Sequence, residues 1–182
     1  MKKKIFLGIG AVIIVFVGWS LYGLFIAEPA SPLATAEGSY EDLNMKVDYS
    51  RPYKKGRVIF GEESEGALQP FGEYWRLGAN ASTEITFNKD VNFGGKPVAA
   101  GSYRMYAVPG ANAWEVSLNS ELGTFGFFEP DSELDVAKVQ APAQNDQPEV
   151  EQLTISFASD STGAKMNLAW DKTLVVVPIT VK

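Results

Sequence analysis

The sequence predicts an all-β domain, an antiparallel β-sandwich or jelly-roll-like barrel, preceded by one N-terminal transmembrane or signal helix. Two observations predict the domain: apolar residues recur at every second position in several short runs, and turn-forming residues separate these runs. A third observation predicts the helix, since an uncharged apolar run follows three lysines at the N-terminus. A chain of 182 residues has room for one such domain and its accessory segments.

The N-terminal apolar run extends from Ile5 to Ile26. As a helix it would be about 33 Å long, enough to cross the hydrocarbon core of a bilayer. The preceding lysines favour the cytoplasmic side, so everything after the run is expected outside the cytoplasm. We therefore assign residues 1–27 to an anchor that contacts the membrane through residues 5–26.

A cleaved signal peptide is the competing interpretation of this segment. Ala34-Thr35-Ala36 matches a small-residue cleavage site, and cleavage near Ala36 would release a secreted domain. The apolar run is longer than that of an ordinary signal peptide, however, and it ends well before this site. We expect the anchor to be retained and the domain to be periplasmic or on the cell surface.

The remaining chain divides into a linker and a β-sandwich domain. Residues 28–44 lack a periodic pattern and are expected to form the linker, which leaves residues 45–182 for the domain. Strict alternation puts one face of a strand in the core and the other in water, as an antiparallel sheet requires. It is clearest over residues 84–88, 114–119, 153–157 and 165–170.

Two details of the C-terminal part predict local structure. Turn residues from Asp160 to Gly163 join two alternating runs and predict a hairpin. The last run, from Leu174 to Val181, is apolar on both faces until Thr180 and predicts a central strand. Pro178 within this run predicts a bulge or a local edge, because proline has no N–H to donate.

Composition excludes several classes of function. The chain contains neither Cys nor His, which removes disulfides, thiolate and imidazole metal sites and the Ser–His–Asp triad. Beyond residue 27 there are 13 basic and 22 acidic residues, a net charge of −9, which argues against a nucleic-acid partner. We expect no cofactor and no metal, and binding rather than catalysis.

A basic segment between Lys46 and Arg57 is the densest unusual feature. It holds five of the 13 cations of the acidic domain, with two tyrosines between them. One interpretation is a site for an anionic glycan or a lipid headgroup. The favoured alternative is that nearby acids neutralise these cations internally. The nearest acids downstream are Glu62, Glu63, Glu65 and Glu73.

Two aromatic segments allow both a binding and a structural interpretation. Trp75 beside Arg76 would suit a ligand platform, but a buried Trp with Arg76 and Asn80 bonded to loop backbone is favoured. Phe125, Phe127 and Phe128, with Phe71, would suit an aromatic sugar-binding face, although core packing explains them more simply.

Three motifs together resemble a known family. They are Tyr49-Ser-Arg-Pro-Tyr-Lys-Lys-Gly-Arg-Val-Ile-Phe-Gly61, Trp75-Arg-Leu-Gly-Ala-Asn-Ala-Ser-Thr83, and Ala100-Gly-Ser-Tyr103 leading to Pro109-Gly110 and Trp114. Their order and spacing resemble domain-of-unknown-function family 2911, common among extracytoplasmic proteins of Bacteroidetes-type bacteria. The resemblance implies a domain identity and a location outside the cytoplasm, but no activity. The chain departs from the family pattern at Phe71 and Ala81, where Tyr and Glu are expected, so a family carboxylate at the second place would be missing.

Three hypotheses for function remain. The leading one is a membrane-tethered, non-enzymatic binding or envelope-structural domain. Its candidate ligand-binding residues are Arg51, Lys55, Arg57, Trp75, Arg76, Asn80 and Thr83. The second is a hydrolase of glycans or envelope polymers that uses two carboxylates, with Glu73, Glu84 and Asp90 as candidates. The third is a protein-docking module of an envelope assembly.

Overall fold

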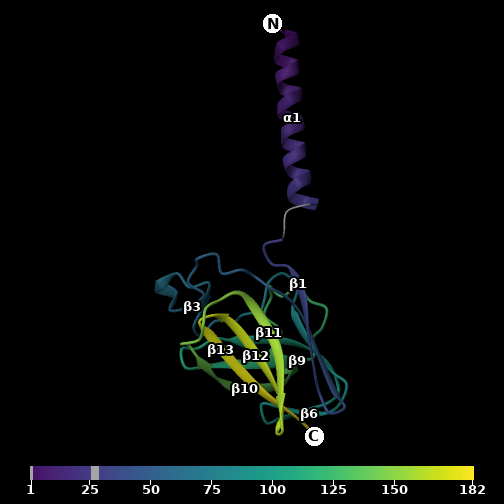
Figure 1. The fold of residues 1–182 in the computed structure, drawn as a ribbon, viewed down its shortest axis with the longest axis vertical. Helices are drawn as coiled ribbons and strands as arrows, with labels where there is room; N and C mark the ends of the chain where they lie inside the picture. The colour runs from purple at the N-terminus through teal and green to yellow at the C-terminus, as the bar shows by residue number, and fades with distance from the viewer. Residues whose placement is uncertain (1, 26–28) are drawn as a thin grey trace. The chain divides into compact units, whose positions relative to one another are not determined.

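A computed structural model describes residues 2–25 and 29–182 (Figure 1). The chain forms two compact units, Met1–Ala30 and Ser31–Lys182. Met1 and residues 26–28, which belong to the expected anchor and linker, lie outside the described residues.

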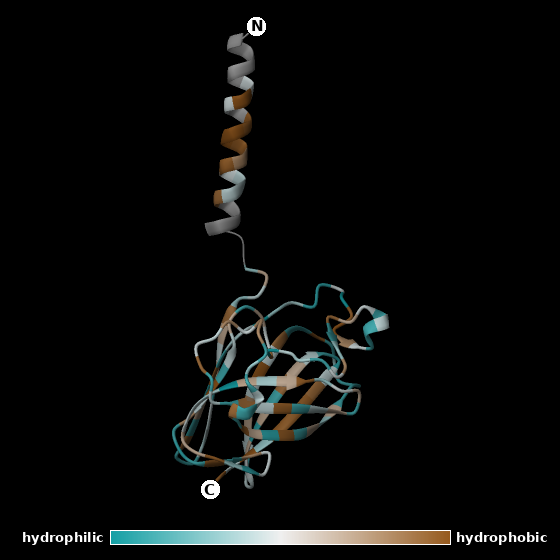
Figure 2. Ribbon diagram, turned by 180° about the vertical axis from the view of Figure 1, so that it is seen from behind, coloured by the Kyte–Doolittle hydropathy of each residue, from teal (hydrophilic) through white to brown (hydrophobic). Residues whose placement is uncertain are grey.

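The first unit is one helix, α1, over Lys2–Phe25. Figure 2 shows the apolar character of its middle turns. Among the residues that the structure describes, no helix meets the length and apolarity needed to cross a bilayer. The anchor over residues 1–27 therefore stays a prediction.

The second unit is mostly antiparallel β-sheet, which confirms the all-β class. Eleven strands form one sheet. Nine of them follow the order β1-β2-β5-β8-β9-β10-β13-β12-β11, and the other two, β6 and β7, lie off this path, with β6 paired to β13 and to β7. The short pair β3 and β4 is parallel. The strands are β1 Leu33–Tyr40, β2 Leu43–Ser50, β3 Phe60–Gly61, β4 Gln69–Pro70, β5 Thr83–Phe87, β6 Val91–Phe93, β7 Lys96–Val98, β8 Gly101–Val108, β9 Ala113–Asn119, β10 Asp135–Gln144, β11 Val150–Asp160, β12 Gly163–Asp171 and β13 Thr173–Val181. Two 3-10 turns, η1 Glu63–Glu65 and η2 Ser132–Leu134, lie in the loops.

The prediction of a linker over residues 28–44 is wrong, because strand β1 lies within this range. This strand pairs with β2 along its whole length, from Leu33 opposite Ser50 to Tyr40 opposite Leu43, and the compact unit starts at Ser31. Sequence alternation missed the strand because it is a sheet edge of mostly small and polar residues, of which only Ala36 is buried.

The two ends of the strand order come together, so the sheet curls around its core. Gly38 of β1 faces the Phe157 side chain of β11 so closely that a Cβ there would lie 2.4 Å from the Phe157 Cβ. The Tyr49 hydroxyl of β2 accepts a hydrogen bond from the backbone N–H of Ile155 (2.9 Å). In Figure 1 the start of β1 and strand β11 border the same side of the domain.

An aromatic cluster, defined by Phe60, Trp75, Trp114 and Trp170, fills one end of the core. The rings of Trp75 and Trp170 stack with their centroids 5.8 Å apart. The centroids of the Phe60 and Trp114 rings are 4.8 Å apart. The indole nitrogens of Trp75 and Trp170 are buried without a hydrogen-bond partner among the described residues. The cluster is therefore held by apolar and ring–ring packing, and not by hydrogen bonds of these two indole groups.

Both local predictions for the C-terminal part are confirmed. Strands β11 and β12 form the expected hairpin, closed where Asp160 pairs with Gly163. Strand β13 is central, with β12 on one side and both β10 and β6 on the other. Pro178 lies between the part of β13 paired to β10 and the part paired to β6, where no N–H is required.

Candidate functional site

The cations of the basic segment are largely engaged inside the domain. Arg51 donates to the Leu153 carbonyl (2.9 Å) and to the Thr154 hydroxyl (2.8 Å), which ties the end of β2 to β11. The Arg57 guanidinium donates to the carbonyls of Tyr53 and Lys54 and so closes its own turn. These guanidinium groups stabilise backbone carbonyls and do not converge on a pocket.

Acids do neutralise this segment, but not the acids that sequence proximity suggested. Lys54 forms ion pairs with Asp171 (2.7 Å) and Glu149 (3.0 Å), from strand β12 and the loop before β11. These pairs raise its pKa. Lys55 stays at the surface with its ammonium over the Tyr53 ring. Proximity in sequence failed because the partners come from the opposite end of the chain.

The second motif separates into core and surface. Trp75 is 2% exposed, and Thr83 is buried with its hydroxyl donating to the Leu77 carbonyl (2.8 Å). The Arg76 guanidinium lies over the Phe127 ring, with its Cζ 5.7 Å from the ring centroid. The Asn80 backbone carbonyl accepts a hydrogen bond from the Gly126 N–H (3.0 Å). The structural interpretation of this motif thus holds for Trp75, and the predicted ligand-binding residues do not share one surface.

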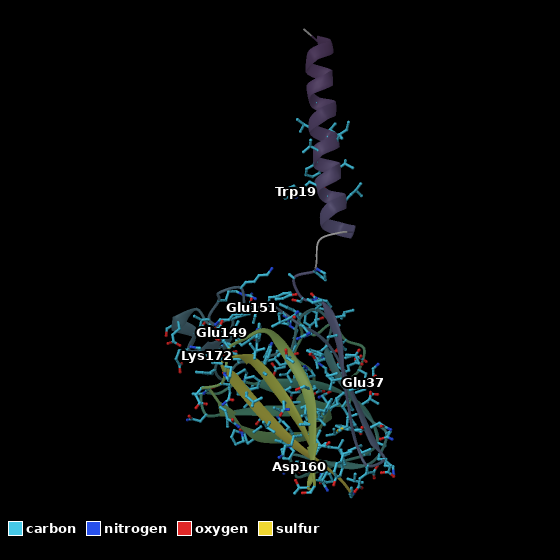
Figure 3. The ribbon with its side chains drawn as sticks, viewed as in Figure 1. Trp19, Glu37, Glu149, Glu151, Asp160 and Lys172 are labelled. Carbon is cyan, nitrogen blue, oxygen red and sulfur yellow. The ribbon has the colours of Figure 1, made fainter. Side chains whose placement is uncertain are left out.

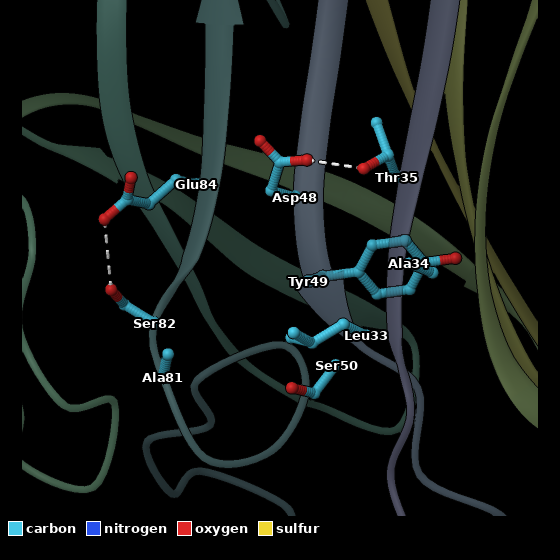
Figure 4. A pocket seen from close by; sticks show the side chains of 9 residues that line it. All are labelled: Leu33, Ala34, Thr35, Asp48, Tyr49, Ser50, Ala81, Ser82 and Glu84. Carbon is cyan, nitrogen blue, oxygen red and sulfur yellow. Dashed lines mark hydrogen bonds between the residues drawn. The ribbon is translucent and has the colours of Figure 1, made fainter.

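The carboxylates named for a hydrolase are also dispersed. Glu73 is exposed, and Asp90 accepts from the Ala100 N–H (2.9 Å) in a turn. Glu84 instead lines a pocket of about 510 Å³ with Asp48, a residue that sequence reasoning treated only as the lone acid of the basic segment (Figure 4). This pocket is the candidate functional site.

Three polar residues of the pocket form a row across three strands. Thr35 of β1 is opposite Asp48 of β2, and Asp48 is opposite Glu84 of β5. Directly opposite residues of an antiparallel pair point to the same face, with Cβ atoms roughly 5 Å apart. The two carboxylates therefore stand side by side on the outer face of the sheet, and the Thr35 hydroxyl donates to Asp48 (2.6 Å).

The polar row continues beyond the pocket across the rest of the sheet. Glu84 is opposite Arg104 of β8, and Arg104 is opposite Asn119 of β9, which in turn is opposite Asp135 of β10. Arg104 is only 1% exposed. A signal for this row was present in the sequence, since these residues occupy the polar positions of alternating strands, but such positions normally face water.

Local contacts favour the ionised form of the Asp48 carboxylate. Burial raises the pKa of Asp48, but hydrogen bonds from Lys46 and Thr35 outweigh that effect, so the net pKa lies below its ordinary value. The Lys46 ammonium is 2.8 Å from the Asp48 carboxylate. Glu84 accepts from the Gly123 N–H (3.0 Å). Two neighbouring carboxylates thus form an acceptor-rich floor.

The walls of the pocket add hydroxyl groups and apolar surface. Ser50 is 2% exposed, and its hydroxyl has no hydrogen-bond partner among the described residues, although it lines the pocket. Such an orphan hydroxyl indicates a position where a ligand or water completes the hydrogen bonding. Leu33 and Ala81 add apolar surface to the lining, with Ala81 below Ser82 and Leu33 beside Ser50 in Figure 4. In the described part of the chain, no group of three or more carboxylates could hold a metal ion.

The fold and this site define a small, mostly antiparallel β domain with an acidic pocket on the outer face of its sheet. The chain belongs to the family described as "Protein of unknown function (DUF2911)", whose match covers residues 31–179. The resemblance carried by the three sequence motifs is thereby confirmed. No curated protein and no solved structure gives a match.

Proposed function

We propose that this protein is a membrane-tethered, extracytoplasmic binding domain that holds a small ligand in the pocket of Asp48 and Glu84 without transforming it. The observation that carries the proposal is the pairing of two carboxylates on adjacent strands, beside a buried hydroxyl that lacks a partner. A volume of about 510 Å³ lies within the usual range for small-ligand sites.

The chemistry of the pocket favours a ligand rich in hydrogen-bond donors. An ionised carboxylate such as Asp48 only accepts hydrogen bonds, and the domain as a whole is acidic, so an anionic ligand would be repelled. Hydroxyl pairs and a protonated amine satisfy these acceptors, and an amino sugar carries both. The expected anionic ligand is less well supported, because Arg51 and Arg57 already bond to backbone carbonyls.

The lowered pKa of Asp48 argues against this residue as the proton donor of a hydrolase. A glycosidase that works through two carboxyl groups needs one of them protonated near neutral pH, which requires a raised pKa. Asp48 has its pKa lowered instead, because Lys46 and Thr35 bond to its charged form. Such a carboxylate is suited to holding a hydroxyl or an amine and unsuited to donating a proton.

A retained anchor fits the fold better than cleavage near Ala36. That residue is the buried centre of β1, opposite Val47 of β2. Cleavage there would remove the first half of β1, including the Leu33 rim of the pocket. An uncleaved N-terminus would keep the strand whole and the domain attached outside the membrane.

A glycan array that includes amino sugars, followed by calorimetry on the best ligand, tests the proposal. Asp48→Asn and Glu84→Gln are each expected to weaken binding about tenfold or more, because one charge-assisted hydrogen bond contributes about 1.5–3 kcal/mol. Glu133→Gln removes an exposed carboxylate elsewhere and is the matched control, expected to bind like the wild type.

Two results would count against the proposal. Wild-type affinity in both pocket variants would remove the pocket as the site. Chromatography that shows a cleaved product after prolonged incubation of the ligand with the protein would replace binding by catalysis.

A further inference from the structure

The loop between β9 and β10 carries an exposed apolar patch, defined by Leu122, Phe125, Phe127 and Phe128. Phe127 is 65% exposed and Phe128 70%. Core packing was the simpler expectation for these phenylalanines, and it is wrong. Contiguous apolar side chains held in water are uncommon on a small domain and mark an interaction surface.

Hydrogen bonds to the loop backbone hold the patch in its exposed position. Beneath it, the buried Arg104 guanidinium donates to the Thr124 hydroxyl (2.7 Å) and to the Phe128 carbonyl. The Tyr74 hydroxyl donates to the Gly126 carbonyl (2.9 Å). Polar groups thus hold the inner side of the loop, and the phenyl rings are left on its outer side.

We propose that this patch contacts the bilayer to which the chain is tethered and holds the ligand pocket beside the membrane surface. The inference rests on the proposed tether and deepens the proposed function. Only six residue steps separate Phe25, the last residue of α1, from Ser31, the first residue of the domain, and six steps of chain reach at most about 20 Å. A bilayer is therefore the partner present at the highest local concentration.

The patch lies at the end of the domain that the tether enters. Leu33, among the first residues of the domain, lines the pocket together with Ala81, and Ala81 pairs with Phe125. Leu33 is itself exposed and apolar. The start of the domain, the pocket rim at Ala81 and the patch at Phe125 are thus neighbours.

Charge and ring geometry favour lipid over other occupants. Phe127 and Phe128 meet edge to face, with an interplanar angle of 89°, and so offer no flat platform for a sugar ring. Glu121 and Glu129 flank the patch, so anionic headgroups gain little there. The Arg76 guanidinium lies over the Phe127 ring, where it is taken up by a cation–π contact. Contact should therefore depend on apolar insertion and resist salt.

The absence of cysteine allows a direct test in the full-length chain. Phe127→Cys, labelled with an environment-sensitive fluorophore, is reconstituted into phosphatidylcholine vesicles with and without doxyl-labelled lipid. The expected result is blue-shifted emission that doxyl lipid quenches and that persists at high salt. Ser161→Cys is the control, because its hairpin beside Asp160 lies at the far end of β11 from Glu151 (Figure 3). Glu151 bonds to the Lys54–Lys55 turn, and the nearby Arg51 N–H donates to the Pro32 carbonyl at the start of the domain.

Each outcome separates the inference from the proposed tether. Failure of the wild type to float with vesicles would remove the tether, whereas flotation with an unquenched Phe127→Cys label would remove the patch contact alone. Blue-shifted emission without doxyl quenching would mean that protein covers the patch, which also overturns the inference. A second label, on Leu122→Cys, should also be quenched by doxyl lipid. It should lose this quenching when Phe125→Ser, Phe127→Ser and Phe128→Ser are added, while near-ultraviolet circular dichroism shows an unchanged core. That result would support the inference.

Discussion

The molecule holds two aromatic groups that the sequence presents alike and the fold treats in opposite ways. The cluster of Phe60, Trp75, Trp114 and Trp170 is packed at the end of the core, with ring centroids 4.8–6.1 Å apart. The patch of Leu122, Phe125, Phe127 and Phe128 is exposed on a loop.

The difference follows from what holds each backbone segment. Trp114 and Trp170 lie at the inward positions of strands β9 and β12, so sheet pairing alone directs them to the core. The patch is in a loop whose inner side is taken by Arg104 and Tyr74, which leaves the rings outside. Burial of an aromatic side chain is thus decided by the partners of its backbone.

The comparison is tested most strongly by removing one ring from each group. Trp170→Ala should lower the free energy of unfolding by about 3–5 kcal/mol, because it opens a large cavity among packed rings. Phe128→Ala should change it by about 0.5 kcal/mol or less, since that ring is exposed. Urea unfolding of both variants measures the contrast.

A gentler substitution at the same position separates packing from polar effects. Trp170→Phe keeps an aromatic ring and removes an indole N–H that is buried without a partner. It should therefore cost much less than Trp170→Ala. Equal losses in Trp170→Ala and Phe128→Ala would show that the two groups are not energetically distinct.

The clamp beneath the patch is tested by Arg104→Met. Three hydrogen bonds from the guanidinium are lost, to Thr124, Tyr74 and Phe128, and we expect a loss of about 1–3 kcal/mol in stability. Hydrogen exchange should accelerate at Gly126, whose N–H bonds to the Asn80 carbonyl, and stay slow at Ala107 in β8.

A matched control comes from the basic segment. Arg57→Met removes a surface guanidinium that bonds only to carbonyls of its own turn, so a change of about 0.5 kcal/mol or less is expected. Unaltered exchange of the loop in Arg104→Met would show that something other than Arg104 holds the patch outward.

Most of the fold was predictable because alternation reports a two-faced strand directly. The runs around Trp114, Ile155 and Leu168 are strands, and Pro178 marks a change of partner. Strand β1 was missed, because an edge strand made of small residues carries almost no apolar periodicity.

The candidate site was much less predictable. Glu84 was named, but its partner Asp48 depends on the register of β2 against β5, and a strand's register is a tertiary property. The Arg51 and Arg57 motifs attracted attention as charges, whereas they serve as hydrogen-bond donors to backbone carbonyls. The sequence shows which side chains can donate hydrogen bonds. It does not show which buried backbone carbonyls need such a donor in the fold.

The last effect that we predict depends on pH and concerns Tyr106, which contacts the polar row at Asp135. Burial raises the pKa of Tyr106, and its hydrogen bond to the Asp135 carboxylate (2.6 Å) raises it further. Above about pH 10 the unfolded chain releases this proton and the folded chain keeps it, so the unfolded state binds fewer protons. Stability contributed by Tyr106 is therefore complete below that pH and declines above it, by at most about 1.4 kcal/mol per pH unit.

Tyr106→Phe should remove this share of the alkaline decline. At neutral pH it should cost about 1 kcal/mol, because Asp135 keeps the Asn119 amide (2.8 Å) and the Lys138 ammonium (3.3 Å) as partners. Urea unfolding from about pH 9 to about pH 11 measures the slope. A decline as steep in the variant as in the wild type would mean that other groups set the alkaline limit. A shallower decline in the variant would show that Tyr106 sets part of the alkaline limit, although it lies on the face that alternation assigns to water.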